Sequence, residues 1–173
     1  MVAQRAFNGH GEGAFEQTDT GPNPTDRAKQ GTKRSLLVDG RGVPTAVVIA
    51  AANVPDFLLL GETLEAQQLE PIADPTAPSR VVCLDRGYRQ RAVIEMCQTF
   101  HVTPAVEARH EEAARLATDP TQHAKRWVVE RTFSWLNRFR RLLIRWEKKS
   151  ENYLSFLHHA CAIITYRHTP LPG

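Results

Sequence analysis

Two apolar runs separated by a short polar turn mark the first half of the sequence. The runs 34-RSLLVD-39 and 43-VPTAVVIAAA-52 flank the turn 39-DGRG-42. Apolar stretches on both sides of Asp-Gly indicate an antiparallel hairpin. Residues 1–33 are rich in Gly, Asn, Thr, Asp and Pro and show no period, so we expect an irregular N-terminal segment there.

A strand–helix–strand pattern follows a proline-rich connection. The run 80-RVVCLD-85 is apolar without alternation, which is typical of a strand covered on both faces. Residues 89–100 repeat apolar positions with a helical period, and residues 101–106 can form another short strand. A hairpin followed by such a unit predicts an α/β fold, in which ligands bind at the carboxyl ends of strands.

Two helices are expected in the last third of the chain. The first is a long helix that begins near Gln122, and the second covers residues 151–166. The apolar positions of the second helix fall on one face: Tyr153, Leu157, Ala160 and Ile164. The pattern as a whole predicts a mixed sheet with flanking helices.

Composition adds the class of protein and its compartment. The chain has 173 residues, 42% of them hydrophobic and 24% charged, which suits one globular domain. Its three cysteines are widely spaced within apolar runs, which favours buried thiols in a reducing compartment over a zinc site. No run approaches the roughly 20 apolar residues of a membrane span, and no signal-peptide core is visible, so we expect a cytoplasmic protein.

The positive charge is concentrated in residues 125–149, which we call the basic segment. It holds nine Lys or Arg against Glu130 and Glu147, a balance of +7, whereas the whole chain carries +3. Solvated surface charge is the default explanation, but cations this dense repel one another unless phosphates meet them. We expect DNA to be contacted by Lys125, Arg126, Arg138, Arg140, Arg141, Arg145, Lys148 and Lys149. Trp135 and Trp146 can stack on unpaired bases or belong to the core.

Two acids are candidate metal ligands. Asp85 closes an apolar run, and Glu130 borders the apolar stripe of the predicted long helix. Each has a simpler explanation: Asp85 as a turn former, and Glu130 as the partner of Arg126 one helical turn away. Two carboxylates are also what Mg²⁺ or Mn²⁺ prefers, and paired ions can drive phosphodiester chemistry, although a full site generally needs a third acid.

Three motifs in order resemble the carboxyl-terminal catalytic portion of bacterial insertion-sequence transposases with an Asp-Asp-Glu triad. They are 21-GPNPTDRAKQGTKRSLLVDGRGVP-44, 82-VCLDRGY-88 and 126-RWVVERTFSWLNRFRRL-142, the last continued by 145-RWEKKSENY-153. The resemblance implies a ribonuclease-H-like fold and Mg²⁺- or Mn²⁺-dependent cleavage and strand transfer of transposon DNA. It further implies a truncated catalytic domain over residues 34–168, preceded by the irregular segment 1–33 and followed by a tail, 169–173.

The resemblance also assigns roles. Asp85 corresponds to the second aspartate of the triad and Glu130 to its glutamate, so both are expected to be catalytic and to bind metal. Arg126 fits an arginine that the family places four residues before the glutamate. His123 and Asn137 stand where the family has a tyrosine and a lysine, which departs from its pattern of DNA-end contacts.

The first aspartate of the triad has no counterpart, because no aspartate precedes Asp19. We therefore expect the fold to lack its first, central strand beside the one that ends at Asp85. We expect the chain to be inactive alone and to form a homo-oligomer when active, and two explanations of the missing aspartate stay open: an upstream-frame transposase product supplies it, or the gene has decayed. Two alternatives stay open: a non-catalytic DNA-binding or regulatory protein derived from a transposase, and a nuclease that uses Asp39 as its third ligand.

Overall fold

A computed structural model describes residues 2–8, 19–67, 80–106 and 127–168. At its centre lies the predicted hairpin, formed by β3 (Gln30–Val38) and β4 (Pro44–Ala51). The two strands are antiparallel, with Thr32 opposite Ala51 and Leu37 opposite Ala46. The prediction of a hairpin around the Asp-Gly turn is confirmed.

The second edge of β3 is also paired. Strand β1 (Val2–Asn8) runs antiparallel to β3, from Val2 opposite Leu37 to Asn8 opposite Gly31, and the short β2 (Gly21–Pro22) pairs with the beginning of β3. The prediction of an irregular segment over 1–33 is therefore wrong for these strands. Backbone pairing with β3 supports this strand, because only Val2 and Phe7 of its seven residues are strong strand formers. The boundaries predicted for the domains stay predictions.

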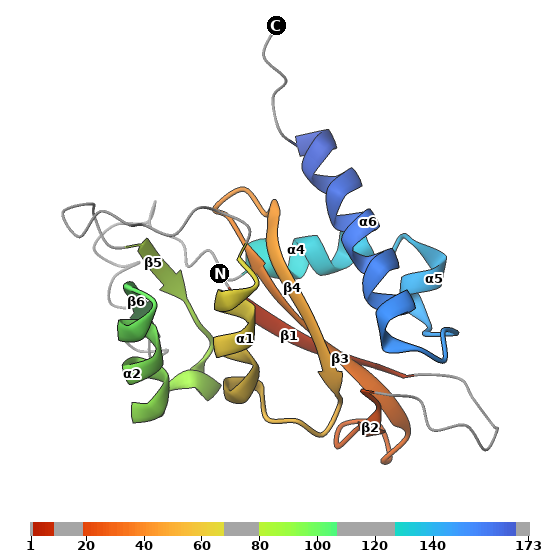
Figure 1. The fold of residues 1–173 in the computed structure, drawn as a ribbon, viewed down its shortest axis with the longest axis horizontal. Coiled ribbons are helices and arrows are strands. Elements are labelled where there is room, and N and C mark those ends of the chain that lie inside the picture. Colours follow the sequence, from red (N-terminus) through yellow and green to blue (C-terminus); the bar gives the residue numbers. More distant parts are fainter. Residues whose placement is uncertain (1, 9–18, 68–79, 107–126, 169–173) are drawn as a thin grey trace, which may run out of the picture.

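A strand–helix–strand unit forms a second, smaller sheet (Figure 1). Strand β5 (Arg80–Cys83) and strand β6 (Val102–Ala105) are parallel and are joined by η2 (Arg86–Tyr88) and α2 (Arg91–Thr99). These elements confirm the predicted unit. The expectation that 80–85 is covered on both faces is wrong, since Val81 is 62% exposed.

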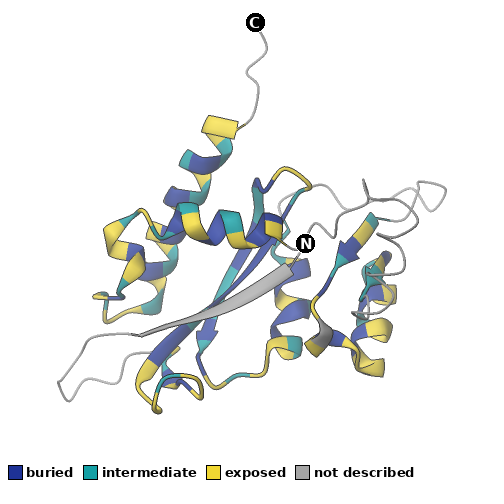
Figure 2. Cartoon of the chain, turned by 180° about the vertical axis from the view of Figure 1, so that it is seen from behind, coloured by how far each residue is buried: buried dark blue, intermediate teal, exposed yellow. Residues whose placement is uncertain are grey.

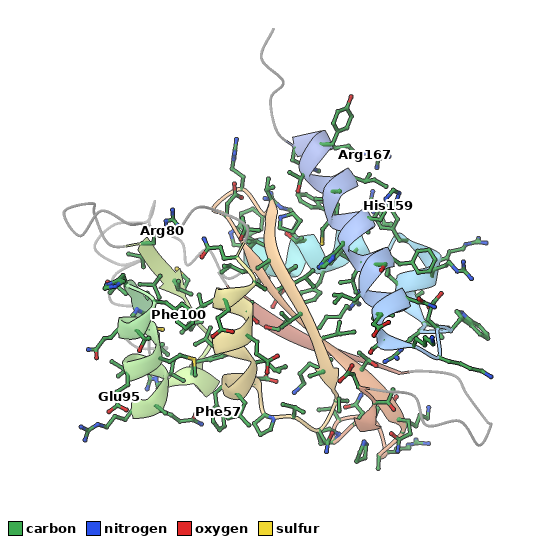
Figure 3. All side chains as sticks on the ribbon, in the orientation of Figure 1. Phe57, Arg80, Glu95, Phe100, His159 and Arg167 are labelled. Carbon is green, nitrogen blue, oxygen red and sulfur yellow. The ribbon has the colours of Figure 1, made fainter. Side chains whose placement is uncertain are left out.

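The large sheet carries different elements on its two faces, because neighbouring residues of a strand point to opposite sides. Leu36 and Val38 belong to one core cluster, which we call the first cluster, with residues of α4 (Trp127–Leu136), α5 (Arg140–Leu143) and α6 (Ser150–His168). Leu37 belongs to the second cluster, with η1 (Asp56–Leu58), α1 (Leu59–Glu65) and the β5–α2–β6 unit. Phe57 and Phe100, labelled in Figure 3, pack against this second cluster.

The C-terminal helices agree with the sequence pattern in part. In α6, the predicted apolar face is buried, and Figure 2 shows the alternation of buried and exposed positions along it: Tyr153, Leu157, Ala160 and Ile164. The single long helix is not observed, because α4 ends at Leu136 and the backbone of Phe139 is extended before α5 begins. Within the described residues, no helix is long and apolar enough to cross a membrane.

Candidate active site and nucleic-acid interface

Asp85 lies two residues beyond the end of β5, where its backbone carbonyl accepts a hydrogen bond from Tyr88 N at 3.0 Å. Leu84 and Tyr88 on either side are buried in the second cluster, whereas Asp85 is exposed. Two buried neighbours thus fix the backbone and leave the carboxylate at the surface, after the carboxyl end of the strand as the sequence predicts.

Glu130 lies in the first turn of α4 and is exposed. Val129 and Phe133 beside it are 2% exposed and belong to the first cluster, so Glu130 sits at the border of the buried stripe. Within the described residues, no hydrogen bond or ion pair engages the Glu130 carboxylate. Its predicted partner Arg126 lies outside those residues, so the simpler explanation of Glu130 is untested.

The two acids are carried by elements that pack on opposite faces of the large sheet. Asp85 is held by the second cluster and Glu130 by the first. Helix α4 contacts both β3 and β1 of the large sheet, and within the described residues β1 pairs only with β3. An approach of the two carboxylates around this edge of the sheet stays a prediction.

The residues that follow Glu130 tie α4 to the β3–β4 turn. The Thr132 hydroxyl, fully buried, donates to the carbonyl of Gly42 at 2.6 Å, and the Arg131 guanidinium donates to the carbonyl of Arg41. Gly42 has a φ of +86°, and a Cβ there would lie 3.0 Å from the Thr132 hydroxyl. A side chain at 42 would therefore be strained and would crowd the turn of α4 that presents Glu130.

Asp39 holds the same turn together. Its Oδ1 accepts hydrogen bonds from the backbone N–H groups of Arg41 at 2.8 Å and Val43 at 2.9 Å. Partial burial alone would raise the pKa of Asp39, but hydrogen bonds from Val43 and Arg41 outweigh it and lower that pKa. The carboxylate is thus engaged in its own turn, which speaks against the alternative of Asp39 as a metal ligand.

The binding of metal by the exposed acids Asp85 and Glu130 stays a prediction. Exposed carboxylates such as Asp85 and Glu130 suit Mg²⁺, which prefers oxygen ligands and keeps several waters. No group of three or more His, Cys, Asp or Glu side chains that could hold a metal occurs in the part of the chain that the structure describes. Each acid is thus a chemically suitable ligand, and their sharing of one metal ion stays a prediction, since they lie on elements that pack on opposite faces of the large sheet.

The cations of the basic segment differ in their exposure to solvent. Exposed cations are found on the 137–139 connection, on α5 and before α6: Arg138, Arg140, Arg141, Lys148 and Lys149. Arg141 also approaches the Glu147 carboxylate at 3.5 Å and lies over the ring of Phe156. These five residues remain candidates for DNA contacts, whereas Lys125 and Arg126 lie outside the described residues.

The prediction that Arg145 contacts DNA is contradicted by its burial. Its side chain is 0% exposed, and its guanidinium donates to the Thr32 hydroxyl at 2.6 Å and to the carbonyls of Glu147 at 3.0 Å and Lys148 at 3.2 Å. Burial lowers the pKa of Arg145, because desolvation disfavours the cation, while Asp19, Tyr153 and Glu147 oppose the shift. Arg145 is therefore a structural residue that joins β3 to the chain before α6.

The burial of a second cation, Arg34, was not predicted from the sequence. It lies within β3, is 0% exposed, and donates to Asn137 Oδ1 at 3.0 Å. Asn137 stands where the resembling family has a lysine, and here its amide oxygen accepts the hydrogen bond of the buried Arg34. The signal in the sequence was a lone arginine at the start of the apolar run 34–39.

The tryptophans divide into packed and exposed residues. Trp135 packs against the first cluster and stacks on His168 with ring centroids 4.1 Å apart. The Arg131 guanidinium lies over both Trp127 and Trp135, 4.7 Å and 4.9 Å from their ring centroids. Trp146 is 61% exposed, so of the two tryptophans proposed for stacking on bases only Trp146 presents a largely free ring.

Comparisons with known proteins give the family. The model of the family described as "Transposase DDE domain" matches residues 6–165. A curated relative from Burkholderia cepacia, named "Putative transposase for insertion sequence element IS402", is 35% identical over 156 residues, which cover 85% of this chain and 68% of the relative. A cryo-EM structure of a simian T-cell lymphotropic virus intasome in complex with PP2A regulatory subunit B56 gamma matches with 14% identity and a TM-score of 0.43. That match covers 99% of this chain and 56% of the other, and a likeness at this level does not establish a shared fold.

Proposed function

Because the chain belongs to the transposase DDE domain family, we propose that it is the catalytic portion of an enzyme that cuts and joins insertion-sequence DNA. The observation that carries this proposal is the family match over residues 6–165, which spans both candidate acids. Asp85 and Glu130 are its proposed catalytic and metal-binding residues.

The positions of the acids support these roles. Each carboxylate is exposed and each is presented by a backbone that buried neighbours hold in place, Leu84 for Asp85 and Val129 for Glu130. A site that binds metal and phosphate needs ligands that are accessible but fixed. The contacts of Thr132 and Arg131 with the β3–β4 turn supply the same support to the helix of Glu130.

The order of elements supports a ribonuclease-H-like fold as part of the proposal. The antiparallel strands β1, β3 and β4 come first, and the parallel pair β5 and β6 and the C-terminal helices follow. In that arrangement the strand carrying Asp85 lies beside the first strand, whose carboxylate completes the triad. Strand β1 pairs with β3 as that first strand would, but it contains no aspartate or glutamate, so the first carboxylate of the triad has to come from a segment ahead of β1.

Mg²⁺ held by Asp85 and Glu130 would polarise the phosphodiester and stabilise charge on the attacking and leaving oxygens. The chain's own exposed arginines, Arg138, Arg140 and Arg141, would hold the DNA backbone through phosphate contacts that carry no sequence information. The acids would thus serve the cleavage reaction and the arginines would bind the DNA. Substitution of an acid should abolish cleavage without loss of binding, whereas substitution of the arginines should weaken binding.

A nicking assay tests the proposal. A polypeptide of residues 1–173 contains two of the three acids that the family resemblance implies, so we expect it to bind DNA and to cleave it little or not at all with Mg²⁺ or Mn²⁺. Fusing the segment that carries the family's first aspartate ahead of β1 should produce metal-dependent nicking of a labelled transposon end.

Within that extended protein, Asp85→Asn and Glu130→Gln should abolish nicking and leave DNA binding intact, because each removes a metal ligand and a negative charge near phosphate. Glu62→Gln is the matched control, since Glu62 is an exposed acid on α1. Nicking by the Glu130→Gln protein would refute the assignment of Glu130, and robust nicking by residues 1–173 alone would refute the argument that the site is incomplete.

A further inference from the structure

We propose that Trp146 is a stacking platform for an unpaired DNA base, so that the protein binds single-stranded or melted DNA beside its duplex contacts. This inference rests on the proposed function, because it takes DNA as the substrate, and it adds the form of DNA that is recognised. Aromatic rings that stack on bases act without regard to sequence, because every base offers a π face.

The first observation is the exposure of the ring. Trp146 is 61% exposed in a connection between α5 and α6, whereas the other tryptophans are engaged by Arg131. Leu143 and Phe156, exposed by 47% and 38%, add apolar surface on the two helices that the connection joins. Single exposed apolar side chains are common on folded proteins, so the exposure of Trp146 gains its meaning from the fixed backbone and the charges described next.

The second observation is that the backbone under the ring is fixed. Arg145, the residue before Trp146, donates hydrogen bonds to the Thr32 hydroxyl in β3 and to the carbonyls of Glu147 and Lys148 on the following turn. The Tyr153 hydroxyl in α6 donates to the carbonyl of Leu142 at 3.1 Å and so ties α5 to α6. A ring held on an ordered backbone loses little entropy when it stacks on a ligand.

The third observation is the charge around the ring, which selects nucleic acid over a protein partner. The exposed cations of α5 and of the turn before α6 lie on both sides of Trp146 in the chain: Arg140, Arg141, Lys148 and Lys149. The acid among them, Glu147, has a side chain only 8% exposed and lies 3.5 Å from Arg141. Cations with an aromatic ring between them form the pattern of a single-strand binding surface.

Binding measured by fluorescence polarisation tests the proposal without any cleavage step. The probes are a labelled single-stranded oligonucleotide and the blunt duplex of the same sequence. Trp146→Ala should weaken binding of the single strand by roughly five- to a hundredfold, the range found for the loss of one stacked base. It should change duplex binding by less than about twofold, since phosphate contacts dominate there.

Trp146→Phe keeps an aromatic ring and should retain most of the single-strand affinity. Tyr166→Ala is the matched control, because Tyr166 is 67% exposed near the end of α6, away from the turn that carries Trp146. In a protein with phenylalanine at positions 127 and 135, fluorescence of Trp146 should be quenched by the single strand and not by the duplex.

The outcomes separate the inference from the proposed function. If the unaltered protein binds neither probe, the proposed function fails. If it binds both and Trp146→Ala loses neither, or loses both equally, the stacking platform is refuted. The platform is refuted as well if Trp146→Ala changes only the oligomeric state in sedimentation, because the ring then belongs to an interface between copies.

Discussion

Replacing Arg145 by leucine should destabilise the fold strongly while removing no DNA contact. The guanidinium is fully buried and holds the Thr32 hydroxyl at 2.6 Å together with two backbone carbonyls before α6. Leucine fills part of the space but leaves these acceptors without a donor. The partners are neutral groups that stay in place, so this is not the exchange of a whole ion pair for apolar residues.

The size of the effect follows from the groups left behind. A buried polar group that loses its partner costs about 1–3 kcal/mol. Thr32 is 1% exposed, and its hydroxyl also donates to the Asp19 carbonyl at 2.9 Å. In the variant this O–H keeps its acceptor, but the hydroxyl oxygen no longer accepts a hydrogen bond from Arg145. Counting Thr32 and one carbonyl as inaccessible to water gives a loss of about 2–6 kcal/mol, against a total stability of about 5–15 kcal/mol for a typical domain.

Urea unfolding followed by circular dichroism measures this loss as a lower midpoint. Arg140→Leu, an exposed arginine five residues earlier, is the matched control and should change stability by about 0.5 kcal/mol or less. Arg145→Lys should fall between the two, because lysine keeps the charge but not the fork of donors. If Arg145→Leu unfolds like the control and instead loses DNA affinity, Arg145 is a phosphate contact and not a structural residue.

Two further predictions concern the β3–β4 turn and the exposed arginines. Hydrogen bonds to the Asp39 carboxylate lower its pKa below the usual 3.8. The ionised carboxylate therefore stabilises the fold above pH 3.8, and this stabilisation is lost as the pH falls further. The urea midpoints of the unaltered protein and of Asp39→Ala should accordingly converge in acid. Asp39→Asn keeps the Oδ1 acceptor and should cost less, and a difference that persists unchanged at low pH would count against a stabilising role of the ionised carboxylate. Reversing charge at Arg140 and Arg141 should reduce the salt dependence of duplex binding by about 0.9 in slope for each phosphate that the protein no longer neutralises. The same reversal at Arg91, exposed on α2 and paired with Glu95 (labelled in Figure 3), should leave the slope unchanged. Equal effects at both places would mean that these arginines form no defined DNA-binding surface.

Much of the fold was predictable because its signals are local. The hairpin around Asp-Gly, the β5–α2–β6 unit and the buried face of α6 each follow from periodicity within a short stretch. Strand β1 was not predictable in this way, since only Val2 and Phe7 of its residues favour strands and its other residues are held by pairing with β3. Pairing between distant residues leaves little trace in the composition of either partner.

The candidate site shows the same division. The exposure of Asp85 and Glu130 beside buried neighbours agrees with their places at the end of an apolar run and at the edge of an apolar stripe. The turn that supports Glu130 could not be read from the sequence, because the contacts of Thr132 and Arg131 with the β3–β4 turn join residues about 90 positions apart. The role of Glu130 therefore depends on a part of the chain that carries no catalytic motif.

The charge of the basic segment is likewise divided by the fold, and this limits how DNA can be held. A single long helix would have spread its arginines around one axis, whereas the break after Leu136 turns Arg145 inward and leaves five described cations exposed. Five phosphate contacts correspond to a slope of about −4 to −5 in the dependence of duplex affinity on salt. The balance of +7 counted along the segment thus overstates its contact with DNA, because a buried arginine that joins β3 to the chain before α6 releases no counterion when DNA binds.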